Sequence, residues 1–207
     1  MTTGDMKHAG VNLDHNNPDH HRLDEETVFG FWVFLMSDAV LFALLFATYA
    51  SMTNRLASGP SGSDLFRLNG VFAETMFLLL STLTFCLASA ALKARQKRQV
   101  LVWLMLTGLL GLLFLGLEYR ELAGLLAKDA GPQRSGFLSA FFVLLTAHGV
   151  HVLAGIIWIC VMMMQIMIFD LQVPVRSRLL RLGLFWHFLD IVWVAIFSIV
   201  YLGGVTA

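Results

Sequence analysis

The sequence has little charge and almost no cysteine, which excludes two large classes of protein. Only 14% of its 207 residues are charged while 57% are hydrophobic, too little polar surface for an ordinary soluble domain. Cys86 and Cys160 are the only cysteines, and each lies inside a long apolar run. A thiol there behaves as a small hydrophobic group, so a disulfide-bonded scaffold is excluded. The composition indicates a membrane protein.

Neither sign of charge is in excess. The chain has 14 basic and 14 acidic residues, so nothing argues for a nucleic-acid partner. Residues 1–27 contain six acidic residues, two basic residues and four histidines, without the apolar core that a secretory signal needs. We expect residues 1–27 to form a hydrophilic, histidine-containing cytoplasmic tail that is disordered and is not cleaved.

Long apolar runs are what the sequence has in abundance. Five stretches are long enough, at 1.5 Å per residue, to cross or nearly cross a hydrocarbon core of about 30 Å. They cover residues 28–52, 71–92, 100–117, 137–169 and 182–205. We expect the third to continue through Leu126 as an interfacial helix. No proline interrupts a span, so the sequence predicts an all-α membrane domain over residues 28–207, a bundle of five transmembrane helices.

The basic residues predict the orientation of this bundle. All 14 lie outside the five spans, nine of them in the tail, second loop and fourth loop, and five on the opposite side. Because positively charged loops stay in the cytoplasm, we expect the N-terminus to be cytoplasmic and the C-terminus periplasmic.

Ionisable side chains remain within the spans or at their edges. An acid near the bilayer centre costs about 2.5–3.5 kcal/mol on insertion scales, so it normally faces protein or a wet cavity. Seven such residues are candidates for a buried polar network or for contacts with partner subunits or lipid: Asp38, Glu74, Glu118, His148, His151, His187 and Asp190. By helical rise, Asp38, His151 and Asp190 lie at similar depth and can meet if their helices are neighbours. Glu74 and Glu118 lie toward the outer face.

Three chemical interpretations of these residues remain open. His148 and His151, like His187 and Asp190, are spaced i, i+3 and share a helical face. Three imidazoles and a carboxylate could form a metal shell, and two imidazoles from different helices could bind haem. The same groups could instead hydrogen-bond the helices together, which we favour because no thiolate and no paired Glu-x-x-His helices accompany them. A proton relay through Asp38 is the third interpretation.

Small and aromatic residues also follow patterns in the spans. Ala39, Ala43, Ala47 and Ser51 recur every four residues in the first span, which predicts a ridge where another helix can approach closely. The five tryptophans are expected mostly near span ends or facing lipid, with the outermost as interfacial anchors and none with a cofactor role. They are Trp32, Trp103, Trp158, Trp186 and Trp193.

Three of the spans resemble those of subunit III of the haem-copper respiratory oxidases. The first, FGFWVFLMSDAVLFALLFATYA, has the buried acid after a serine, and the fourth, SGFLSAFFVLLTAHGVHVLAG, has the His-Gly-x-His signature. The fifth, FWHFLDIVWVAIFSIVYL, has Trp-His-Phe-x-Asp-x-x-Trp. The typical mitochondrial form has seven spans and commonly a glutamate where this chain has Asp38. The shorter chain, the aspartate and the string GPQRSGFLSAFF resemble most closely the bacterial ubiquinol oxidases of the cytochrome bo type.

This resemblance implies a non-redox accessory subunit of a complex that oxidises ubiquinol, reduces dioxygen to water and pumps protons. It implies haems and copper on partner subunit I and none on this chain, bound phospholipid, and a multi-pass chain in the bacterial inner membrane. The implied protein partners are subunits I and II and a small subunit IV. The chain would stabilise subunit I and support proton uptake, with Asp38 nearest to it and no catalytic residue of its own.

Two other functional classes remain as alternatives to a quinol oxidase subunit. The first is a five-span subunit III of a cytochrome c oxidase. The second is a membrane b-type cytochrome, with His148 or His151 opposite His187 as axial haem ligands. A small transporter is disfavoured because no span is broken by proline and no inverted repeat is apparent.

Overall fold

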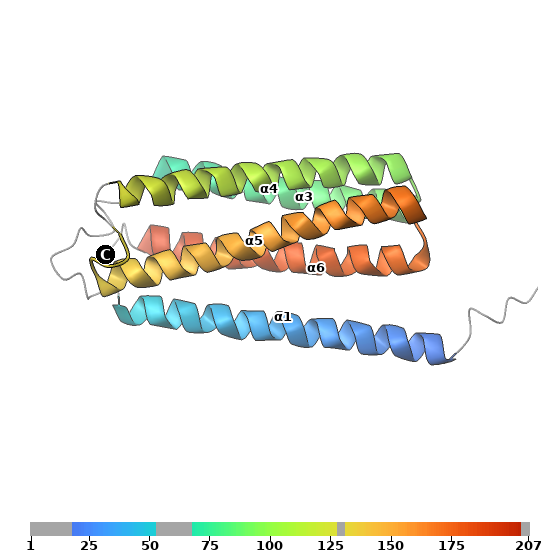
Figure 1. Ribbon diagram of the computed structural model, residues 1–207, viewed down its shortest axis with the longest axis horizontal. Helices are drawn as coiled ribbons and strands as arrows, with labels where there is room; N and C mark the ends of the chain where they lie inside the picture. The colour runs from blue at the N-terminus through green and yellow to red at the C-terminus, as the bar shows by residue number, and fades with distance from the viewer. Residues whose placement is uncertain (1–17, 53–67, 128–130, 204–207) are drawn as a thin grey trace, which may run out of the picture.

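The computed structural model describes residues 18–52, 68–127 and 131–203, which are almost entirely helical (Figure 1). The helices are α1 (Pro18–Met52), α3 (Leu68–Lys93), α4 (Lys97–Leu126), α5 (Gly136–Phe169), α6 (Val173–Ile196) and the π-helical turn η2 (Phe197–Leu202). Five helical segments are long and apolar enough to cross a membrane, the last one combining α6 with η2. The predicted all-α bundle of five transmembrane helices is therefore confirmed.

The helices differ from the predicted spans mainly at their ends. α1 begins at Pro18 rather than at residue 28, so residues 18–27 of the expected tail are helical, whereas residues 1–17 of it lie outside the described residues. Proline is well tolerated at the start of a helix. α4 continues without a break to Leu126, so the expected interfacial segment is part of a spanning helix. α6 begins at Val173 rather than at residue 182, again with a proline in its first turn. Hydropathy identifies only the apolar part of a helix. The backbone hydrogen bonds of α1, α4 and α6 continue past that part into more polar residues.

Four helices form two antiparallel pairs, and α1 lies at the edge. α3 pairs with α4 and α5 with α6, and α4 also packs on α5 (Figure 1). α1 packs against α5 and α6, and only 17% of its most apolar window is buried, against 44% for α3. Phe29, Val40 and Leu44 on α1 are 67–70% exposed. Much of this helix is therefore left for lipid or for another protein.

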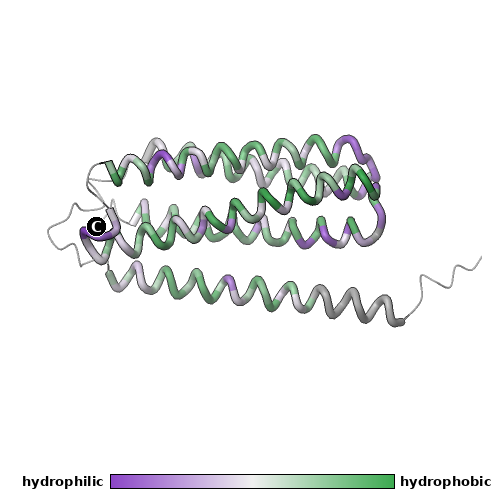
Figure 2. Tube along the Cα trace, in the orientation of Figure 1, coloured by the Kyte–Doolittle hydropathy of each residue, from purple (hydrophilic) through white to green (hydrophobic). Residues whose placement is uncertain are grey.

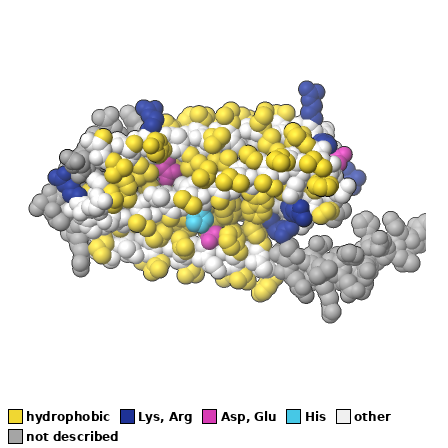
Figure 3. Space-filling model, viewed as in Figure 1, with side chains coloured by type: hydrophobic (Ala, Val, Ile, Leu, Met, Phe, Trp, Pro, Cys, Tyr) yellow, Lys and Arg dark blue, Asp and Glu magenta, His cyan; other side chains and the backbone are white. Residues whose placement is uncertain are grey.

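Two tight turns meet at one end of the bundle. The α3–α4 turn passes through Arg95 at φ 54° and the α5–α6 turn through Asp170 at φ 60°, a left-handed conformation that side chains with a Cβ adopt at a cost. Lys97 Nζ lies 3.6 Å from Asp170 Oδ1 and links the turns. Charged side chains gather at the ends of the bundle, whereas its sides are apolar (Figures 2 and 3). A predominantly apolar band between two charged ends is what a membrane requires.

The core is aromatic, and two tryptophans belong to it. Trp186 and Trp193 are 1% and 0% exposed, so the expectation that the tryptophans lie mostly at span ends or in lipid is wrong for these two. Each indole N–H has a partner, because Trp186 donates to Ser81 Oγ and Trp193 to Thr75 Oγ1, both at 3.1 Å. A buried indole is stable when its donor is satisfied, and the two bonds join α6 to α3.

Candidate functional site

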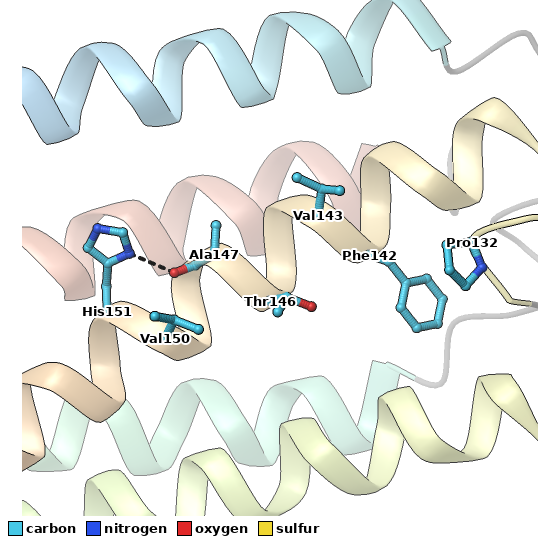
Figure 4. A pocket seen from close by; sticks show the side chains of 7 residues that line it. All are labelled: Pro132, Phe142, Val143, Thr146, Ala147, Val150 and His151. Carbon is cyan, nitrogen blue, oxygen red and sulfur yellow. Dashed lines mark hydrogen bonds between the residues drawn. The ribbon is translucent and has the colours of Figure 1, made fainter.

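Asp38 and His151 lie within ion-pair distance of each other between α1 and α5, about midway along the bundle. His151 Nε2 lies 3.8 Å from Asp38 Oδ1, and the other ring nitrogen is 2.7 Å from the carbonyl oxygen of Ala147 (Figure 4). A carbonyl can only accept, so Nδ1 carries a proton and Nε2 faces the carboxyl group. Phe42, one turn after Asp38, covers the imidazole at a ring distance of 5.1 Å. The contact joins α1 to α5.

An apolar groove runs along α5 beside this pair. His151 lies at one end of it, and the groove has a volume of about 500 Å³. It is lined by Pro132, Phe142, Val143, Thr146, Ala147, Val150 and His151 (Figure 4). On the face drawn in Figure 3 a histidine and an acidic side chain lie side by side amid apolar surface. The groove is thus a shallow, open apolar depression on the side of the bundle, with a polar group at one end.

His148 does not contact Asp38, although it shares a helix face with His151 in the sequence pattern and Phe42 packs against both imidazoles. Its side chain is fully buried, stacked on Trp193 at 5.3 Å and perpendicular to Phe114 at 5.8 Å. Neither ring nitrogen has a hydrogen-bond partner among the described residues. Residues three apart on a helix differ by about 60° around its axis. That difference directs His148 toward α4 and α6, and His151 toward α1.

His187 and Asp190 form a second polar patch, between α6 and α3. His187 Nε2 lies 3.9 Å from Cys86 Sγ, and Asp190 lies beside Thr82 and within electrostatic range of His187. The expected meeting of Asp190 with Asp38 and His151 does not occur, because Asp190 points to α3 whereas Asp38 points to α5. Of the three residues expected to meet because of their similar depth, only Asp38 and His151 are in contact.

Three glutamates form a third group near the end of the bundle where α3 begins and α4 ends. Glu74 and Glu118 are 2% and 3% exposed, and Glu74 is within electrostatic range of both Glu118 and Glu121. Tyr201 donates a hydrogen bond of 3.1 Å to Glu121 Oε2. We call Glu74, Glu118, Glu121 and Tyr201 the acid cluster. Sequence reasoning missed Glu121, although its i, i+3 spacing from Glu118 was a usable signal.

The small-residue ridge of α1 is not covered by any of the described helices. Ala39, Ala43, Ala47 and Ser51 are all exposed, while Leu35, Asp38, Phe42 and Tyr49 supply the buried face. Among the described residues no three His, Cys, Asp or Glu side chains converge as metal ligands would. The polar residues thus lie in three separate groups, and the ridge faces outward.

Comparison with known proteins matches almost the whole chain. A family model described as cytochrome c oxidase subunit III matches residues 10–205. The chain is 49% identical to a cytochrome bo(3) ubiquinol oxidase subunit 3 from Pseudomonas putida, over 89% of each chain. It is 47% identical to the protein of that name from Pseudomonas aeruginosa, over 93% of this chain and 92% of the other. It is 38% identical to a cytochrome c oxidase subunit 3 from Alkalihalophilus pseudofirmus, over 92% and 93%.

Proposed function

The chain belongs to the cytochrome c oxidase subunit III family, and on this premise we propose that it is the accessory subunit III of a proton-pumping quinol oxidase of the bo type. The complex would oxidise ubiquinol and reduce dioxygen to water. The observation that carries this proposal is the identity of 47–49% to three cytochrome bo(3) ubiquinol oxidase subunits. Two others of that name are 36% and 38% identical, and a cytochrome c oxidase subunit is 38% identical.

In this proposal the chain itself carries out no redox step. The haems and copper belong to partner subunit I, and the intramembrane residues of this chain fix the packing of its helices. The arrangement of polar groups supports that role, because each group joins two helices: Asp38 with His151, and His187 with Cys86. Polar contacts between membrane helices contribute on average about 0.6 kcal/mol and at most about 1.7 kcal/mol each.

The partner surface would be α1, the least covered helix. Its exposed ridge of alanines and Ser51 allows the backbone of a second helix to approach closely. We assign this ridge to subunit I, whereas subunit II and a small subunit IV would contact other faces. The apolar groove along α5 would hold an acyl chain of a phospholipid, because it offers apolar lining with one polar end.

The chain would lie in the bacterial inner membrane with its N-terminus in the cytoplasm and its C-terminus in the periplasm. Lys93, Arg95 and Lys97 in the α3–α4 turn lie at the same end of the bundle as the basic residues that begin α6 (Figure 1). Positive charge concentrated at one end supports the cytoplasmic assignment of that end.

Co-purification tests the proposal. A tagged full-length chain, extracted gently from its membrane, is expected to bring down a haem- and copper-containing subunit with oxygen uptake that depends on ubiquinol. Uptake driven by reduced cytochrome c but not by ubiquinol would contradict the quinol assignment in favour of a cytochrome c oxidase. A haem absorbance spectrum from the isolated chain alone would instead indicate a b-type cytochrome.

A further inference from the structure

The acid cluster places three carboxyl groups in a part of the core that has little access to solvent. The ion pairs found among the described residues are Lys97 with Asp170 and His151 with Asp38, so none involves these glutamates. Carboxylates close together in a low-dielectric interior cannot all remain ionised without compensating charge. No compensating cation pairs with them within residues 18–52, 68–127 and 131–203, so we expect at least one of the three to hold a proton. A neutral carboxyl group needs both a hydrogen-bond donor and an acceptor.

His148 is a further buried side chain near this cluster, and neither of its ring nitrogens has a hydrogen-bond partner among the described residues. It precedes Gly149, where an added Cβ would lie 2.9 Å from Glu118 Oε2, so the Glu118 carboxyl packs directly on that turn of α5. His148 also contacts Phe114, one turn before Glu118, and Trp193, which bonds to Thr75 next to Glu74. The fully buried imidazole thus lies about one helical turn further into the bundle than the Glu118 carboxyl, against Phe42, Phe114 and Trp193.

Four buried atoms of these side chains lack partners within the described chain. They are Glu74 Oε2, Glu118 Oε1, and Nδ1 and Nε2 of His148. Leaving a buried polar atom unsatisfied costs about 1–3 kcal/mol, and a water molecule with two to four polar neighbours removes that cost. Glu121 lies five residues before Leu126, about 8 Å along the helix, so water from the nearer membrane surface has a short way to travel.

We propose that the acid cluster and His148 enclose a binding site for water molecules, which bridge the carboxyl groups and exchange their protons with the membrane surface near Leu126. Tyr201 supplies one donor, to Glu121, and water supplies the donors and acceptors for the remaining atoms. This site does not involve Asp38 and does not depend on the electron donor of the complex.

Infrared spectroscopy of the whole complex in membranes tests this site. The spectrum of the unmodified protein minus that of Glu118→Gln is expected to contain a carboxylic acid C=O band, which moves to lower frequency soon after transfer to D2O. Gly149→Ala is expected to shift this band without removing it, because the new methyl group displaces the Glu118 carboxyl. Asp170→Asn, which changes an exposed acid at the other end, is the matched control and should leave the band unchanged.

Three results would overturn the proposal. One is a carboxylate band in place of the acid band, and another is an acid band that D2O does not move over hours, as in a dry site. The third is a density map in which the carboxyl groups bond directly to one another or surround a metal cation, rather than water. Should Glu118→Gln fail to assemble, the D2O shift in the unmodified complex and the density between Glu74 and Glu118 decide the matter.

Discussion

The imidazole of His151 bridges two helices: its Nδ1 donates to the backbone of its own helix at Ala147, and its Nε2 lies 3.8 Å from Asp38 Oδ1 on α1. The first contact places a proton on Nδ1 and fixes the ring orientation, so that Nε2 is the nitrogen that faces the carboxyl group. A distance of 3.8 Å is too long for a hydrogen bond and within the range of an ion pair. Of the two ion-pair contacts among the described residues, this is the one that connects α1 to another helix.

Asp38→Asn is expected to weaken the attachment of α1 while leaving the haem content of the assembled oxidase unchanged. The amide keeps the size of the side chain but removes its charge, so we expect a loss of about 1 kcal/mol, within the range of polar contacts between membrane helices. Thermal inactivation and the haem spectrum of the purified complex measure the two effects. Asp170→Asn, in an exposed pair worth less than about 1 kcal/mol, serves as the control. Loss of haem from a fully assembled complex would contradict this role.

The rate at which each cysteine reacts can show which membrane-facing surfaces are covered by other subunits. Cys86 lies in the polar patch with His187, which we expect to meet protein because polar groups at bilayer depth avoid lipid. Cys160 is also exposed, in a stripe with Leu153, Ile157 and Met164, which we expect to meet lipid. Assembly should therefore slow the reaction of Cys86 with a lipid-soluble maleimide at least several-fold and leave Cys160 unchanged. Equal rates at both thiols in the complex would refute the distinction.

Gly155→Ala is expected to destabilise the bundle because Trp186 occupies the space that the methyl group needs. An added Cβ would lie 3.0 Å from Trp186 Cζ3, and the indole is held in place by its bond to Ser81. Overpacking of this kind costs about 1–3 kcal/mol. Gly116 has no atom within 4 Å of the position of an added Cβ, so Gly116→Ala should be neutral or slightly stabilising. Unfolding in mixed detergents measures both, and equal effects would contradict the packing argument.

Trp193→Phe is expected to cost about 1–3 kcal/mol, because it removes a buried hydrogen bond and leaves Thr75 without its donor. The remaining ring would still cover His148, so the loss reflects mainly the bond between α6 and α3. The free energy of unfolding in detergent is the measurement. Trp32→Phe is the matched control, since Trp32 is 50% exposed and surface changes usually stay within about 0.5 kcal/mol. A Trp193→Phe chain as stable as that control would rule out the proposed contribution.

Only some of the contacts among the polar residues could be predicted from the sequence. Sequence reasoning identified Asp38 and His151 as possible neighbours from depth alone, and their helices do pack together. It could not separate Asp190 from them, because depth along a helix says nothing about rotation around its axis. It also missed Glu121, which hydropathy assigned to an interfacial segment although tertiary contacts bury much of it against Tyr201.

Hydrophobicity and motif spacing determined the number of spans, the all-helical class and the family, because in a membrane each backbone polar group must be satisfied within its own helix. The rotation of each helix and the choice of neighbours were decided only in the tertiary structure. Lipid is as apolar as a protein core, so an apolar side chain carries no signal of which one it will face. For that reason Trp186 and Trp193 became the centre of the core, while Ala39, Ala43 and Ala47 were left on the outside.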